Sequence, residues 1–187
     1  MEEDRRTAPE PIQRIVLLGF MCSGKSTVGA SLARRLEWGF LDFDVEIEAR
    51  EGRTIGAMVD AEGEGYLRAR EAELTAEVAD SSALVVAPGG GWITEPELLG
   101  SMRPGTLAVW LRVSPEETAR RLMEDTIDRP FRDLPDPLTP IRSMMAEREP
   151  LYRLADLAVN AGADSVEAVA FEVEMVVRRE GFVRGSR

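Results

Sequence analysis

Residues 15–27 have the sequence IVLLGFMCSGKST, and this stretch decides most of what can be inferred about the fold. Its part from 19 to 27 matches the phosphate-binding loop pattern G-x-x-x-x-G-K-[ST] at every fixed position. The apolar run before the loop predicts a buried strand. After the loop an apolar residue recurs at every fourth position from Val28 to Leu36, which predicts a helix with one apolar face. Strand, glycine loop and helix in this order indicate a nucleotide site.

The loop residues predict how a nucleoside triphosphate is bound. Glycines let successive backbone N–H groups converge on phosphate oxygens, and the positive end of the following helix lies behind them. We expect Lys25, the only lysine in the chain, to reach the outer phosphates, and the Ser26 hydroxyl to bind Mg²⁺. The other positions of the loop expected to contact ATP are Cys22, Ser23, Gly24 and Thr27.

Composition limits the classes of partner and site. The chain has 187 residues, enough for one well-buried domain. Its net charge of −11 argues against nucleic acid or a membrane as partner, so an anionic substrate has to be held by a local group of arginines. There is no histidine, which excludes imidazole bases, and the single cysteine fits a reducing compartment. Without a membrane-length apolar run or a secretory signal, we expect a cytoplasmic protein and a monomer.

Segments with strand-like and helix-like patterns alternate along the chain. After the first strand, further strands are predicted at 40–44, 83–87, 106–113 and 156–159. Helices are predicted to about 36, at 45–50, at 54–80 with breaks at Gly63 and Gly65, from Ser114, at about 139–148 and from Val166, while Thr94 and Glu97 are placed to form a capping box. This alternation predicts an α/β fold in three layers, with a central parallel sheet of five strands and helices on both faces.

The chain shows one domain with two irregular segments. Residues 1–13 are charged and contain prolines, so we expect a flexible tail before a single domain at 14–187. Residues 124–140 contain four prolines among charges and show no period. A loop of this length in a compact domain is often a lid, and we predict one here.

Two groups of residues are expected where strands of the sheet end. Asp42 and Asp44 lie two apart, so on an extended segment their side chains point the same way. One carboxylate would lie near Mg²⁺ and the other would accept a hydrogen bond from an alcohol; the alternative is a solvated pair that caps a helix. Gly89, Gly90 and Gly91 follow the third strand and predict either a close approach to the backbone or a flexible turn.

Three arginines are candidates for binding anions. Arg68 and Arg148 each have a local alternative, which for Arg68 is an ion pair with Glu64 or Glu71 on its own helix. Arg129 lies in the predicted lid, where a guanidinium can close onto a phosphoryl group in transfer. Its alternative is a solvated loop charge.

These pieces, in this order, resemble the shikimate kinase family. The resemblance runs from Ile15 over nearly the whole chain and implies a nucleoside-monophosphate-kinase-like fold with a lid. It also implies the ATP-dependent phosphorylation of the 3-hydroxyl of shikimate, in aromatic amino-acid biosynthesis. The matching motifs are the loop 19–27, Phe40-x-Asp42-x-Asp44, Leu67-Arg68-x-x-Glu71, Gly89-Gly90-Gly91, Arg129-Pro130 and Arg148-x-Pro150-Leu151-Tyr152.

The resemblance further implies a role for each matched residue. On the acceptor side, Asp44 would hold the substrate hydroxyls, Arg68 and Arg148 would bind the carboxylate, and the three glycines would offer N–H groups. On the nucleotide side, the implied contacts are Arg121 and Arg129 with ATP, Ser26 with Mg²⁺, and Asp42 with Mg²⁺ through water. The implied catalytic residues are Lys25, Asp44 and Arg129.

Two other functions fit part of the same pattern. A gluconate-type sugar-acid kinase also takes an anionic polyol, although the Asp-x-Asp and triple-glycine motifs favour shikimate. An ATP-binding regulatory module without transfer activity is the alternative from another class, and the intact Lys25, Ser26, Asp44 and Arg129 argue against it.

Overall fold

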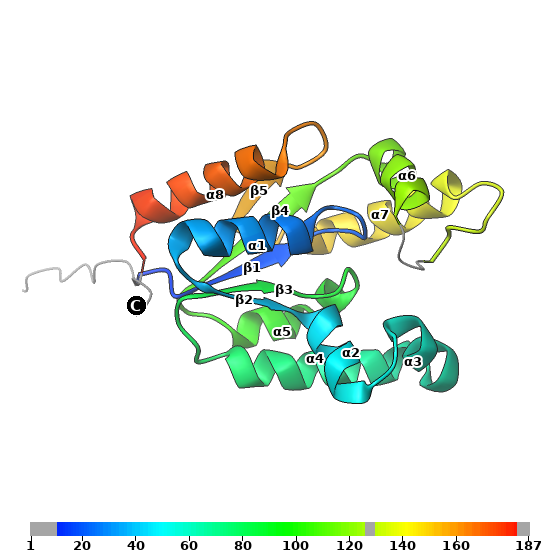
Figure 1. Cartoon of the computed structure of the whole chain (residues 1–187), viewed down its shortest axis with the longest axis horizontal. Coiled ribbons are helices and arrows are strands. Elements are labelled where there is room, and N and C mark those ends of the chain that lie inside the picture. Colours follow the sequence, from blue (N-terminus) through cyan, green and yellow to red (C-terminus); the bar gives the residue numbers. More distant parts are fainter. Residues whose placement is uncertain (1–10, 126–129, 183–187) are drawn as a thin grey trace, which may run out of the picture.

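The computed structural model describes residues 11–125 and 130–182 and contains one sheet between two layers of helices (Figure 1). All neighbouring strands pair in parallel, in the order β2-β3-β1-β4-β5. The strands are β1 Arg14–Leu18, β2 Gly39–Asp42, β3 Leu84–Ala87, β4 Thr106–Arg112 and β5 Leu157–Asn160. The α/β class and the parallel sheet of five strands are confirmed.

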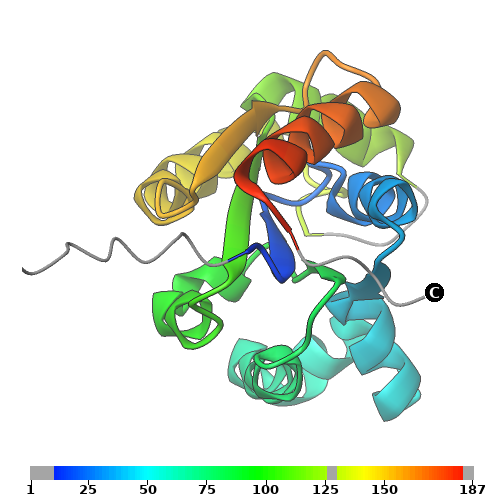
Figure 2. The ribbon, with the colours of Figure 1, turned by 90° about the vertical axis from the view of Figure 1, so that its left-hand side faces the viewer.

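The helices cover both faces of this sheet (Figure 2). The first face is covered by α1 Lys25–Leu36 and α8 Val166–Glu180. The second face carries α2 Phe43–Glu51, α3 Ile55–Glu62, α4 Glu64–Val78, the 3-10 turn Trp92–Thr94, α5 Pro96–Ser101 and α7 Leu138–Tyr152. Helix α6 Pro115–Glu124 packs on α7 beyond the carboxyl ends of the strands.

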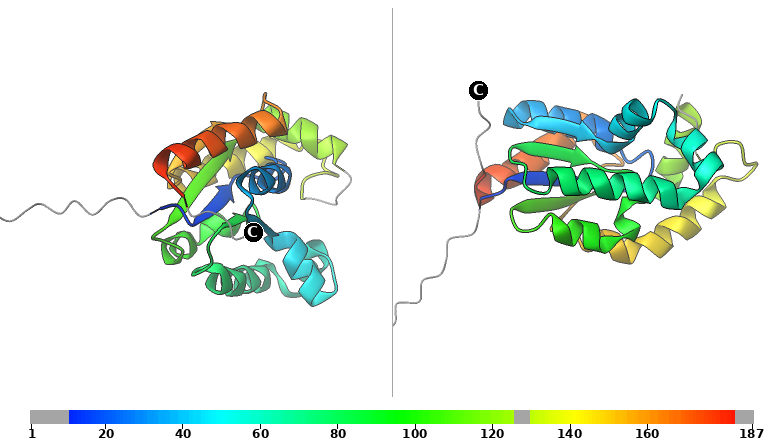
Figure 3. Two further views of the ribbon diagram at one scale, coloured as in Figure 1. Left: turned by 60° about the vertical axis from the view of Figure 1, so that its left-hand side comes forward. Right: turned by 90° about the horizontal axis from the view of Figure 1, so that it is seen from below.

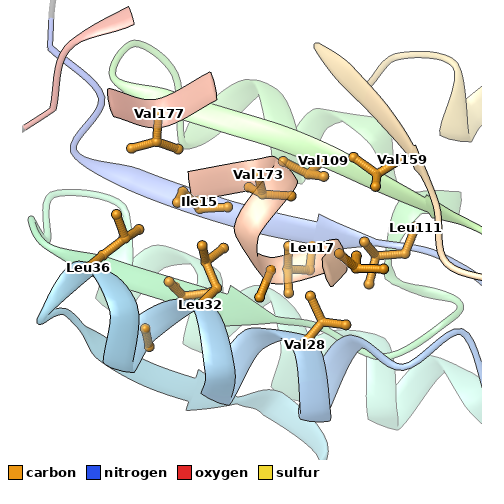
Figure 4. Close-up of a cluster of buried hydrophobic side chains, with 14 of the residues drawn as sticks. Ile15, Leu17, Val28, Leu32, Leu36, Val109, Leu111, Val159, Val173 and Val177 are labelled. Atoms are coloured by element: carbon orange, nitrogen blue, oxygen red, sulfur yellow. The ribbon is translucent and has the colours of Figure 1, made fainter. Parts of the chain in front are cut away.

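Strand β1 is buried on both faces, which explains its uninterrupted apolar run. Ile15 and Leu17 pack with α1 and α8 in the cluster drawn in Figure 4. Val16 and Leu18 point to the opposite face, into a second cluster. Since successive side chains of a strand alternate between faces, the central strand β1 carries apolar residues at every position after Arg14.

The second strand is shorter than predicted, and this changes the geometry of the two aspartates. β2 ends at Asp42, whose Oδ1 accepts hydrogen bonds from the N–H groups of Asp44 (3.0 Å) and Val45 (3.4 Å). Asp42 is therefore the N-cap of α2, and Asp44 lies in the first turn of that helix. The prediction that both side chains project from one extended strand was wrong, while the capping alternative is confirmed for Asp42.

Three helix boundaries also differ from the prediction. The segment 54–80 breaks only at Gly63, and Gly65 lies inside α4. Thr94 forms no capping box, because its hydroxyl donates to the carbonyl of Gly91 and α5 begins after Glu95. Helix α7 continues past the predicted end at Arg148, because the burial of Tyr152 holds a last turn that contains a proline.

The predicted tail and lid are only partly described by the structure. Within the predicted tail 1–13, the N–H of Ile12 donates to Gly181 O (3.0 Å) and that of Gln13 to Gly105 O (2.8 Å), so contacts with the domain begin before residue 14. The two ends of the described chain thus lie side by side (Figure 3). Part of the predicted lid, 126–129, lies outside the described residues. No helix in the described ranges is long and apolar enough to cross a bilayer.

Candidate active site

The phosphate loop follows β1, the strand between β3 and β4 at which the strand order reverses. Ligands of open parallel sheets bind at such a point. Gly24 is the N-cap of α1 and has φ 91°, a backbone conformation that favours glycine. The ammonium group of Lys25 folds back over the loop and donates to the carbonyls of Gly19 (2.9 Å) and Phe20 (3.2 Å). The Thr27 hydroxyl donates to Gly24 O (3.0 Å), within the first turn of the helix.

Ser26 and Asp42 form a pair of oxygen donors at the edge of the loop. The Ser26 hydroxyl lies 2.5 Å from Oδ2 of Asp42, whose other oxygen caps α2. A hydroxyl and one carboxylate suit Mg²⁺, which keeps several waters and takes few protein ligands. Within the described ranges no cluster of three or more cysteine, aspartate or glutamate side chains is placed to hold a metal ion. The two donors Ser26 and Asp42 fit a Mg²⁺ ion that takes its other ligands from water and bound phosphates.

A cavity of about 500 Å³ lies over the loop and α1. Asp42 and Asp44 line one end, and Arg121 and Asp164 line the other. The Arg121 guanidinium donates to Cys22 O (3.2 Å) and to Ala161 O (2.8 Å), so it joins the phosphate loop to the turn after β5. The cavity has the dimensions of a small-molecule site and runs from the phosphate loop toward that turn.

Beside this cavity, the two predicted anion-binding arginines reach the same glycine turn from different helices. Arg148, on α7, donates from Nη1 to Gly90 O (3.2 Å). Arg68, on α4, lies so close to Gly91 that a Cβ atom at that position would overlap its guanidinium. The triple glycine therefore permits a close approach of side chains to the backbone, and is more than a flexible turn.

Glu71 links Arg68 to Asp44 in this site. Its side chain is fully buried and forms an ion pair with Arg68 on the same helix, so the local alternative for Arg68 is correct as a contact. The pair nevertheless lies in the site, because a Cβ atom at Gly89 would overlap Glu71 and lie 3.1 Å from Oδ1 of Asp44. Burial raises the pKa of Glu71 to about 7, against the opposing effect of Arg68 and with a further increase from Asp44.

The comparisons with known proteins can be set beside this geometry. The family model for shikimate kinase matches residues 21–178, most of the chain. The chain belongs to the shikimate kinase family. The shikimate kinase of Prochlorococcus marinus (strain MIT 9313) is 37% identical over 172 residues, which cover 89% of this chain and 89% of that protein. That of Burkholderia thailandensis is 36% identical over 177 residues, covering 94% and 96%.

Solved structures of shikimate kinases also superpose on this chain. The enzyme from Acinetobacter baumannii in complex with shikimate has a TM-score of 0.83 and 32% identity, and covers 90% of this chain and 94% of its own. The enzyme from Aquifex aeolicus has a TM-score of 0.76 and 34% identity, covering 89% and 96%. A gluconokinase from Sinorhizobium meliloti has a TM-score of 0.59 at 20% identity, covering 91% and 94%, and shares the fold alone.

In this member of the shikimate kinase family, Glu71 and Tyr152 also belong to the site, although the sequence motifs that contain them predict no part for either in binding ATP or shikimate. Glu71 stands three residues after Arg68, a spacing that predicts contact on a helix, but its complete burial is visible only in the structure. Tyr152 is buried and donates from its hydroxyl to Gly90 O (3.0 Å). Burial raises the pKa of Tyr152 to about 12, against the opposing effects of Arg148 and Arg68. The lid arginine, Arg129, lies outside the described residues.

Proposed function

We propose that the protein transfers the terminal phosphoryl group of ATP to the 3-hydroxyl of shikimate with the residues gathered around the phosphate loop and the glycine turn. As a member of the shikimate kinase family, the chain is a small-molecule kinase. The observation that carries the residue assignments is the meeting of Arg68 and Arg148 at the glycine turn beside Asp44. In a protein of net charge −11, two guanidinium groups in one place supply what a small anion needs.

The phosphate loop and Lys25 would bind the donor. Backbone N–H groups of the loop meet the phosphates, and the ammonium group of Lys25 exchanges the carbonyls of Gly19 and Phe20 for phosphate oxygens. Ser26, with Asp42 through water, would hold Mg²⁺. When bound, this ion neutralises charge on the phosphates. Arg121 would contact the nucleotide at the other end of the cavity.

The acceptor would bind at the glycine turn. Arg148 and Arg68 would hold its carboxylate, and the backbone N–H groups of the turn would contact its hydroxyls. Asp44, beside Glu71 and Gly89, would accept the hydrogen bond of the reacting hydroxyl and orient its oxygen toward the phosphoryl group. Phosphoryl transfer depends mainly on positioning and charge neutralisation, so these contacts account for most of the catalysis expected. Arg129 would add a charge from the lid.

An assay of ADP release with different acceptors tests the proposal. We expect turnover with shikimate, and none with gluconate or without an acceptor. Turnover with gluconate would assign the acceptor site to another polyol acid, and binding of ATP without turnover on any acceptor would contradict the transfer function. The cytoplasmic location and the monomeric state stay predictions from the sequence.

A further inference from the structure

A second cavity, of about 600 Å³, lies where the carboxyl ends of β4 and β5 face α7. It borders the phosphate loop at Phe20 and Ser23. Among the described linings, Ser23 is the residue that it shares with the cavity of about 500 Å³ over that loop (the nucleotide cavity). Neither Lys25 nor Arg68 nor Arg148 lines it. The volume falls within the range of small-molecule sites, and the function proposed above leaves this space unused.

Three charged side chains line this cavity, and two of them are neutralised by partners. Arg142 forms an ion pair with Glu116 (2.6 Å), and Glu149 forms one with Arg153 (2.6 Å). Arg112, the last residue of β4, forms no ion pair with any residue of the described ranges. The cavity therefore presents one uncompensated cation in a strongly acidic protein.

Arg148, one of the two arginines proposed to bind the acceptor, shares this property, whereas Arg68 is paired with Glu71. Arg148 also has no carboxylate partner among the described residues, whereas most exposed arginines of those ranges do, as Arg50, Arg120 and Arg178 illustrate. An arginine without an internal counter-charge can pair with an external carboxylate and loses no existing ion pair. Arg112 has this character and lies at the edge of a cavity.

The rest of the lining is mostly aromatic and aliphatic, and its uncharged polar residues are Ser23, Ser114 and Asn160. The guanidinium of Arg112 lies 5.2 Å from the centre of the Trp110 ring, and Trp110 stacks on Tyr152 at 5.6 Å. Phe20 adds a third aromatic ring to the wall. The Ser23 hydroxyl is buried and has no hydrogen-bond partner among the described residues.

We propose that this cavity is a second binding site, for a small planar carboxylate. The acid group pairs with Arg112, and the ring lies against the apolar wall that Phe20, Met145 and Tyr152 form. This proposal stands on the cavity and its charges, and does not depend on the identity of the phosphoryl acceptor.

The two sites share a wall, so they are coupled. Phe20, which lines the cavity, lies under the guanidinium of Arg148 at 5.8 Å. Tyr152, also in the wall, holds the carbonyl of Gly90. A ligand in the cavity therefore changes the affinity for the acceptor, and the acceptor changes the affinity for the ligand by the same factor. This coupling, unlike the site, rests on the proposed function.

Tryptophan fluorescence of the whole protein tests the site, because Trp110 lines the cavity while Trp38 and Trp92 are buried elsewhere. The probes are benzoate, benzamide, which has the ring without the charge, and acetate, which has the charge without the ring. We expect a saturable change with benzoate, and binding of the other two weaker by about tenfold or more. Equal binding of benzoate and benzamide, or no saturation with benzoate, would overturn the proposal without any substitution.

Two substitutions then locate the bound benzoate. Arg112→Ala should weaken benzoate binding by about tenfold or more, and leave turnover unchanged. Arg142→Ala, which removes an arginine of the same cavity that is already paired, should have a smaller effect. As the shikimate concentration increases, the Kd of benzoate should change and then level off, because both ligands bind at the same time. If the Kd of benzoate instead increased without levelling off, benzoate and shikimate would compete for one site. That outcome, or benzoate binding that survives Arg112→Ala and is lost in Arg148→Ala, would place benzoate in the acceptor site and refute the second site.

Discussion

The hydroxyl of Tyr152 donates a 3.0 Å hydrogen bond to the carbonyl oxygen of Gly90, and the guanidinium of Arg148 donates to the same oxygen at 3.2 Å. Both donors come from the last turns of α7, and the acceptor lies in the turn after β3. The carbonyl is therefore held both by Tyr152, which stacks on Trp110, and by Arg148. The position of Gly90, and with it the proposed acceptor site, depends on the end of α7.

Tyr152→Phe tests this dependence. The substitution keeps the ring and removes one hydrogen bond to a carbonyl that Arg148 still contacts, which typically costs about 0.5–1.5 kcal/mol. We expect the KM for shikimate to rise about fivefold or more, with a smaller change in the KM for ATP. Tyr66→Phe is the matched control, since the hydroxyl of Tyr66, on α4, donates to Glu51 at the end of α2 (2.8 Å). Equal effects of the two substitutions on KM would contradict the role of Tyr152.

Arg148→Ala should raise the KM for shikimate much more than the KM for ATP. A charge-assisted contact contributes about 1.5–3 kcal/mol, which corresponds to a change of tenfold or more in the KM. Steady-state kinetics with each substrate varied in turn measures this. Arg153→Ala serves as control, because Arg153 directly follows α7, is exposed and pairs with Glu149. A change confined to the KM for ATP would overturn the assignment.

Lys25→Ala should lower kcat by about a hundredfold or more, because it removes a charge that stabilises the transferring phosphoryl group. The fold should persist, since the ammonium group donates to carbonyls of its own loop on the surface of the cavity. Circular dichroism checks the fold and the coupled assay checks turnover. A kcat near that of the wild type would exclude Lys25 from the transition state.

Glu71 should make the stability of the protein decrease with pH. Its pKa is raised in the folded state from 4.5 to about 7, so the folded protein holds a proton that the unfolded chain releases. The stabilisation is therefore complete below about pH 4.5 and is lost as the pH rises through about 7, by roughly 3 kcal/mol.

Glu71→Gln isolates this effect. Its free energy of unfolding, measured with denaturant from pH 5 to pH 8, should increase relative to that of the wild type as the pH rises. Glu73→Gln is the control, because Glu73 is exposed and pairs with Arg70. If the difference between Glu71→Gln and the wild type did not depend on pH, Glu71 would not titrate in this range.

Cys22 lines the nucleotide cavity, and its Sγ atom lies 4.0 Å from a carboxylate oxygen of Asp125. ATP bound over the loop should cover the thiol, so ATP should slow its alkylation. The rate of labelling by iodoacetamide, followed by mass spectrometry with and without ATP, measures this directly because the chain has one cysteine. Equal rates would place the nucleotide away from Cys22.

Local sequence patterns determined the elements of this fold. The loop 19–27 and the serine cap at Ser114 are set by contacts within a few residues, and the apolar run of β1 is a short continuous pattern in the sequence. Such patterns are visible in a single sequence because periodicity and capping depend on near neighbours. Local patterns gave a wrong helix end where a distant contact matters. Helix α7 was predicted to end at about Arg148, but the burial of Tyr152 extends it beyond Pro150.

Only the tertiary structure decided how the site is assembled. Sequence motifs predicted Asp44, Arg68, the glycine turn and Arg148 as site residues. The packing of α4 and α7 on one face of the sheet brings Arg68 and Arg148 to the same turn. That packing also buries Glu71 beside Asp44 and encloses the cavity at Arg112. Contacts between residues far apart in the chain depend on how whole elements bury their apolar faces, and no local pattern records that.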